Sequence, residues 1–182
     1  SDISVDSPTN NFCTWNPLAI RRDSVSPVVV YSEGNLKASI PIYGEAFGSM
    51  YPTTGKWYSE ILIHNLTYGL SLYGAAPAMD GQRGDTDGSI GYANNGNKYV
   101  LGSVTSYGAT YTTGDIIGIA VDLDGDHVTF YKNNASQGTI SGSLTAGVGY
   151  GLMLGDERSG THILNCGQDS SFAGNKTAQG NQ

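Results

Sequence analysis

Short runs of apolar residues, separated by glycine, asparagine and proline, recur along most of the chain. Many of these runs are rich in β-branched and aromatic side chains, a composition that favours β-strands. No segment keeps apolar residues at the 3.6-residue period of a helix over three turns. The pattern therefore predicts an all-β protein of about ten to thirteen short strands with little or no helix.

The segment 114–138, GDIIGIAVDLDGDHVTFYKNNASQG, is the strongest of these signals. Its first half, 116–123, is apolar on both faces, which predicts an interior strand of a packed sheet. Asp124-Gly125-Asp126 is a turn signal, and 128–131 alternates again. Two strand-like runs around an Asp-Gly step predict a β-hairpin, and we take this hairpin as the centre of the core.

The remaining strand candidates lie on both sides of this hairpin. They are 28–31, 36–40, 47–51, 56–64, 70–73, 89–92, 98–101, 137–140, 147–154 and 162–166. We predict that they pack as two antiparallel sheets face to face, a β-sandwich of the jelly-roll type. The sandwich is expected over 12–172, after an irregular lead-in at 1–11 and before a polar tail at 173–182 that only Phe172 can anchor.

The amino-acid composition limits the kinds of molecule that this chain can bind. Only 14% of the residues are charged, the net charge is −7, and the nine basic residues form no cluster. Such a chain lacks the electrostatic footprint of a nucleic-acid binder and is not suited to an anionic membrane surface. No apolar run reaches the length of a membrane helix, and 1–11 has no character of a signal peptide. The abundance of Tyr, Asn, Thr and Gly suits neutral, hydroxyl-rich partners such as glycans.

The two cysteines, Cys13 and Cys166, lie near opposite ends of the chain. Their spacing does not fit a metal site. A disulfide is possible if the terminal strands are neighbours, but free, mostly buried thiols are favoured.

The order of the motifs resembles that of the SPRY (B30.2-like) domain, within the concanavalin-like sandwiches. The resemblance rests on GKWYSEILI (55–63), GSIGYANNGNKY (88–99), TTGDIIGIAVDLDGDHVTFYKNNASQG (112–138) and GYGLML (149–154). The flanking pieces, PTNNFCTWNPL (8–18) and LNCGQDSSFAGNKTAQGN (164–181), resemble the borders of SPRY-like modules in bacteriophage virion proteins. The segment 21–51 departs most from the pattern.

The resemblance implies a non-catalytic binding module of a phage virion, in a tail fibre or another exposed appendage. Its partner would be a glycan or protein of the host surface, with no cofactor and no insertion into a membrane. A structural role, decorating the capsid or tail and contacting other virion proteins, is the alternative, and a homo-oligomer stays open.

Loops at one end of the sandwich are expected to hold the partner. We expect 74–88, 104–113 and 155–160 to converge there, because they carry Tyr, Asp and Arg side chains between turn signals. Tyrosines next to glycine-rich turns are candidates for exposure and offer rigid contact area, and arginine offers a planar donor fork. For Arg83 and Arg158, ion pairing with neighbouring carboxylates is the favoured interpretation. The candidate ligand-binding residues are Arg83, Asp85, Asp87, Tyr92, Tyr107, Tyr111, Asp156 and Arg158.

Catalysis and metal binding are weighed against structural roles. Asp122–Asp126 superficially resembles a calcium loop, but a strand resumes at once and no glutamate follows, so a hairpin turn is favoured. Asp80, Asp85 and Asp87 are a better cation candidate, although solvated loop carboxylates are the favoured interpretation. The four glutamates form no strand-borne pair of the glycosidase type, and no nucleophile elbow is present. We therefore expect no enzyme, no metal and no cofactor, with a glycan-active enzyme as the remote alternative.

Overall fold

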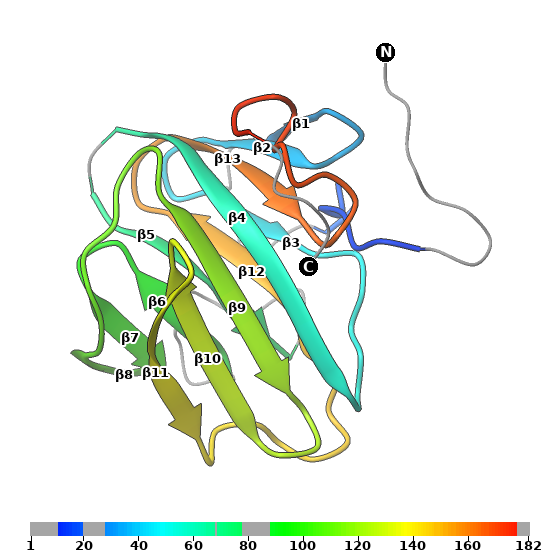
Figure 1. Cartoon of the computed structure of the whole chain (residues 1–182), viewed down its shortest axis with the longest axis vertical. Coiled ribbons are helices and arrows are strands. Elements are labelled where there is room, and N and C mark those ends of the chain that lie inside the picture. Colours follow the sequence, from blue (N-terminus) through cyan, green and yellow to red (C-terminus); the bar gives the residue numbers. More distant parts are fainter. Residues whose placement is uncertain (1–10, 20–27, 68, 78–87, 178–182) are drawn as a thin grey trace.

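The chain folds as two antiparallel β-sheets packed face to face (Figure 1). The computed structural model describes residues 11–19, 28–67, 69–77 and 88–177, and these contain no helix. The seven-stranded sheet has the order β1 (Val30–Ser32), β2 (Lys37–Ile40), β13 (Gly160–Asn165), β4 (Lys56–Leu66), β9 (Ile116–Asp122), β10 (His127–Lys132) and β11 (Ala135–Ser141). The six-stranded sheet has the order β3 (Glu45–Phe47), β12 (Gly151–Asp156), β5 (Ser71–Ala76), β6 (Ile90–Ala93), β7 (Asn97–Val100) and β8 (Ser103–Ser106). The predicted all-β sandwich is confirmed.

The predicted central hairpin is the β9–β10 pair. Asp122 pairs with His127 and Ile117 with Lys132, in antiparallel register. On its other edge β9 pairs with β4 along seven positions from Lys56 to Leu62. β9 is therefore an interior strand, as its apolar faces predict.

The core lies between the two sheets and is built from alternate residues of each strand. Ile117, Ile119, Val128 and Phe130 of the hairpin face inward, and all are buried. The opposite sheet contributes Tyr73 and other buried side chains to the same cluster: Ala75, Ile90, Tyr92 and Leu154.

Several predicted boundaries shift. The expected strand at 47–51 is instead Glu45–Phe47, and the one at 147–154 begins only at Gly151. Gly48 instead takes part in an isolated bridge with Trp15, and residues 146–147 form a turn before β12. Residues 12–15 pair with the rest of the chain through a single bridge, between Trp15 and Gly48.

The carboxylates in the turn of the central hairpin form hydrogen bonds and an ion pair within the protein. Asp122 accepts a hydrogen bond from Gly125 N and pairs with Lys56 at 2.9 Å. Asp124 accepts from Gly55 N, and Asp126 accepts from the main chain of Ser143 and Leu144. The hairpin-turn interpretation of this acidic run is therefore confirmed.

The two ends of the described chain lie on the same side of the molecule, the first in blue and the last in red (Figure 1). Gln168 Nε2 donates to the carbonyl of Cys13 at 3.2 Å. Phe172 is buried against Leu62 and Ile163, so it anchors the segment after β13 as predicted.

Candidate functional site

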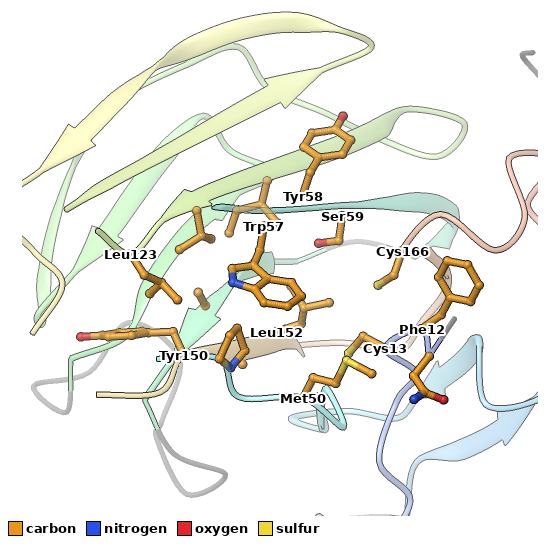
Figure 2. A pocket seen from close by; sticks show the side chains of 16 residues that line it. Phe12, Cys13, Met50, Trp57, Tyr58, Ser59, Leu123, Tyr150, Leu152 and Cys166 are labelled. Carbon is orange, nitrogen blue, oxygen red and sulfur yellow. The ribbon is translucent and has the colours of Figure 1, made fainter. Parts of the chain in front are cut away.

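A pocket opens between the two sheets, on the side where the first and last described segments meet (Figure 2). Its volume is about 110 Å³, and its walls are mostly apolar. We call it the inter-sheet pocket. It is lined by Asn11, Phe12, Cys13, Met50, Pro52, Trp57, Tyr58, Ser59, Ala75, Ile119, Val121, Leu123, Tyr150, Gly151, Leu152 and Cys166.

The pocket is left open because small residues occupy positions where larger side chains would fill the space between the two sheets. Ser59 of β4, Ala75 of β5 and Gly151 of β12 all line it. The Ser59 hydroxyl also shares a hydrogen bond of 2.7 Å with the buried hydroxyl of Tyr73. A side chain at Gly151 would collide with the ring of Tyr51, at 2.5 Å from its Cβ. Glycine is therefore required at this position of the wall.

Trp57 is the largest side chain of the lining and is 49% exposed. Trp57 and Ser59 point into the pocket, whereas Tyr58 lies on the other side of β4 (Figure 2). The indole Nε1 donates to the carbonyl of Thr54 at 2.8 Å. The turn that carries Thr54 is tied to the hairpin through Gly55 and Asp124. Trp57 is thus a fixed, half-exposed aromatic wall, the kind of side chain that dominates binding interfaces.

Cys13, Cys166 and Phe12 occupy one end of the pocket, and Leu123 and Tyr150 the other (Figure 2). Both cysteines are free, as the sequence favours. The Cys166 thiol donates a hydrogen bond to the sulfur of Cys13, and this lowers the pKa of Cys13 to about 6 because it favours the thiolate. The same contact, together with burial, raises the pKa of Cys166.

A second hollow of about 360 Å³ lies on the outer face of the seven-stranded sheet, behind Trp57. We call it the outer groove. It is lined by Lys56, Trp57, Tyr58, Ala120, Val121, Asp122, His127, Thr129 and Thr139. Tyr58 stands edge-on to Tyr131, with ring centroids 6.2 Å apart. A Cβ at position 118 would lie 2.5 Å from the Tyr58 hydroxyl, so Gly118 leaves room for the Tyr58 ring.

The tyrosines predicted to be exposed are not. Tyr92 is fully buried and Tyr111 nearly so, while Tyr107 is half-buried. Tyr92 packs against Tyr107, Tyr111 and Phe130 at centroid distances of 5.1 to 5.6 Å. The Tyr111 hydroxyl donates to main-chain carbonyls of Ser71 and Tyr92. These hydroxyls satisfy buried carbonyls, so the exposure prediction is wrong for Tyr92 and Tyr111.

Asp156 is also interior. It is 1% exposed, and its Oδ2 lies 2.9 Å from Nε2 of the equally buried His162. Arg158 is half-buried, and its Cγ would meet a Cβ at Gly69 at 2.7 Å. Arg83, Asp85 and Asp87, together with Asp80, lie outside the described residues.

Two of the three loops predicted to converge lie at one end of the sandwich, whereas the described ends of the third lie at the other, with 78–87 outside the described residues. Residues 107–113 and 157–159 lie at the end where β4 finishes, since Thr113 Oγ1 accepts from Leu66 N and Thr67 Oγ1 donates to Ser159. The connection from β5 to β6 starts at the other end, because Ala76 pairs with Gly151 and Gly88 lies beside Pro77 and Tyr150. Part of each expected loop, 74–76, 104–106 and 155–156, is strand.

Sequence reasoning placed Trp57 and Tyr58 on a sheet but did not single them out as site residues. The signal that could have found Trp57 is its position next to a Gly55 turn, at the very start of a strand, where a sheet face is incompletely covered. Cys13, Met50 and Leu152 carry no such signal, because three separate segments bring them together.

Within the described residues no group of three or more His, Cys, Asp or Glu side chains could hold a metal ion. The same part of the chain contains no helix long and apolar enough to cross a membrane.

The sequence profile of the SPRY domain matches residues 56–148, just over half of the chain. The chain belongs to the SPRY domain family. Over 120 residues it is 30% identical to the E3 ubiquitin-protein ligase RKP of Arabidopsis thaliana, an alignment that covers 62% of this chain and 9% of that protein. The SPRY chain thus spans less than a tenth of that curated relative.

Solved structures share the fold. The SPRY domain of human HERC1 superposes with a TM-score of 0.69 at 19% identity, over 85% of this chain and 99% of that domain. Stonustoxin gives a TM-score of 0.65 at 15% identity, over 85% of this chain and 27% of the toxin. SPRY domains are typically protein-interaction modules.

Proposed function

We propose that this SPRY domain is a non-catalytic recognition module that holds a protein partner by seating one apolar side chain in the inter-sheet pocket beside Trp57. The observation that carries the proposal is the pocket itself, an apolar hollow with a rigid, half-exposed indole in its wall. Membership of the SPRY family supports a protein as the partner.

The size of the pocket fits one side chain. An apolar cavity of ~150 Å³ holds a benzene molecule, so the 110 Å³ here suits a side chain of the Val, Leu or Met class. Full burial of such a side chain contributes roughly 1.5–3 kcal/mol. That is enough for one anchor of an interface, and the exposed residues around Trp57 supply the remaining contacts.

A selection from a random peptide library displayed on yeast tests this proposal. Binders of the wild-type chain should share one apolar residue, and Trp57→Ala should weaken them about tenfold or more. Met50→Trp, which fills the pocket from its rim, should do the same. Val104→Ala, an exposed apolar residue on β8, is the matched control and should leave affinity unchanged.

Selected peptides that bind Trp57→Ala and Met50→Trp as tightly as wild type would contradict the proposal. Melting curves of each variant separate a lost pocket from a lost fold.

The proposed setting of the module is a bacteriophage virion, in a tail fibre or another exposed appendage that meets the host surface. The support is the resemblance of the segments 8–18 and 164–181 to the borders of phage SPRY-like modules. Decoration of the capsid or tail, in contact with other virion proteins, is the alternative. Electron cryomicroscopy of the particle distinguishes them, because a structural role covers the Trp57 side of the domain with neighbouring subunits.

The outer groove favours a second candidate function, binding of a host glycan. Hydroxyl and charged groups from Lys56, Asp122 and Thr129 line it next to the 51% exposed ring of Tyr58, a face on which a sugar ring can stack. A glycan array separates the two candidates. Thr129→Ala, which lies in the outer groove alone, should weaken glycan binding and spare the selected peptides, whereas Met50→Trp should have the opposite effect.

A further inference from the structure

Two thiols from opposite ends of the sequence meet at one end of the inter-sheet pocket. Cys13 precedes the Trp15–Gly48 bridge, and Cys166 directly follows β13. Their side chains are in hydrogen-bonding contact, and both line the pocket (Figure 2). The pair is therefore close together and faces a cavity through which a small reagent can approach.

The backbone on both sides of the pair is held in place. Thr14 N donates to Ser49 Oγ at 3.1 Å, and Ser49 N donates to the carbonyl of Thr14 at 2.8 Å. On the other side, Cys166 N donates to Gln168 Oε1, and Gln168 Nε2 donates to the carbonyl of Cys13. The thiols thus meet on ordered backbone, which lowers the entropic cost of joining them.

We propose that Cys13 and Cys166 are a reactive dithiol that small neutral disulfides oxidise, through the inter-sheet pocket, to a bond between the first and last described segments. In the first step the Cys13 thiolate attacks one sulfur of the reagent, whose S–S bond breaks and releases one thiolate. Cys166 then loses its proton and attacks the sulfur of Cys13, displacing the second reagent thiol. Two protein thiols are oxidised, and one reagent disulfide is reduced to two thiols.

The surroundings of the two thiols determine which of them attacks the reagent first. The Ser49 hydroxyl donates to the Cys13 sulfur, and the contact between the two thiols lowers the pKa of Cys13 while it raises that of Cys166, so Cys13 is the first nucleophile. Among the described residues, the titratable side chain that responds to the charge of this pair is Tyr73. Burial raises the pKa of Tyr73 well above its ordinary value, so it stays neutral.

The test uses the whole chain and 2-hydroxyethyl disulfide as the reagent. The folded protein should lose the mass of two hydrogens and both alkylatable thiols, without dimers. Its Tm should rise by roughly 10 °C, because the new bond closes a long loop. A stable single adduct on Cys13, disulfide-linked dimers, or thiols that react no faster than in urea-unfolded chain would each overturn the proposal.

Two variants test the role of the Cys166 thiol through the pH profile of Cys13 alkylation by iodoacetamide. In wild type the rate should rise with a midpoint near pH 6. Cys166→Ala removes the donor and should move the midpoint upward by more than about one pH unit, whereas Cys166→Ser keeps a donor and should move it less. Equal midpoints in all three proteins would show that the contact does not activate Cys13.

Discussion

A buried pair of polar side chains, Asp156 and His162, connects the two sheets at the residue scale. Asp156 ends β12 in one sheet and His162 lies in β13 of the other, and both are under 2% exposed. Gly160 completes the arrangement, since a Cβ there would lie 2.2 Å from Asp156 Oδ2 and 2.5 Å from His162 Nε2. Asp156, which the sequence analysis predicted to bind a ligand, instead contacts the buried imidazole of His162.

Removing this carboxylate should destabilise the fold. Asp156→Ala leaves the buried His162 Nε2 without its partner, which should lower the free energy of unfolding by about 1–3 kcal/mol. Asp156→Asn keeps an acceptor and should cost less. Urea denaturation measures both, and equal stability of the Ala variant and wild type would refute a structural role for the pair.

The local sequence around a tyrosine does not determine whether its side chain is buried or exposed. A tyrosine next to a glycine-rich turn can face solvent or satisfy a buried carbonyl, and both uses have the same local sequence. Tyr92 is buried because the pairing of β6 with β5 turns it toward Phe130, and Tyr111 is buried where its hydroxyl donates to the carbonyls of Ser71 and Tyr92. Long-range register, which no local pattern carries, decides their burial.

At the scale of elements, close approach of backbones in the six-stranded sheet depends on two glycines. Gly74 of β5 pairs with Gly91 of β6. A Cβ at Gly74 would lie 2.0 Å from the carbonyl oxygen of Ile90, and one at Gly91 would lie 2.3 Å from the Leu72 side chain. The first neighbour is backbone and cannot move aside.

Gly74→Ala should therefore separate β5 from β6 and cost about 3 kcal/mol or more. Gly125→Ala is the matched control, because its Cβ would meet only the tip of the Asp122 side chain in an exposed turn. We expect that variant to lose less than about 1 kcal/mol. Similar unfolding free energies for the two variants would contradict the packing described for this pair.

The strands themselves were largely predictable, since β-branched alternation and turn residues are local signals. The central hairpin, with its Asp-Gly turn, is predicted almost to the residue. Boundaries fail where glycine and tyrosine alternate, as at 104–113 and 147–154, because such segments suit an edge strand and a loop equally well. Apart from strands joined by a hairpin, the order of strands within each sheet carries no local signal.

At the scale of the whole molecule, the candidate site is set by the way the chain closes on itself. The first described segment crosses to the end of β13, beside the start of β4, and the inter-sheet pocket forms where they meet. Of the loops expected to converge, 107–113 and 157–159 lie at one end, whereas Ala76 and Gly88, which flank the undescribed part of the third, lie at the other. The sequence could indicate a recognition module through its SPRY motifs, but not this pocket, because seven separate segments contribute to its lining.

The most direct test of the account is a titration of the nitrogen-15-labelled chain with a peptide selected for binding. The chain has two tryptophans, so its spectrum has two indole N–H signals. Trp57 lines the pocket, whereas Trp15 is fully buried in the core. We predict that the indole signal of Trp57 shifts together with the amides of Met50 and Leu152, while that of Trp15 stays in place. Saturable binding that leaves the Trp57 signal unmoved would contradict it.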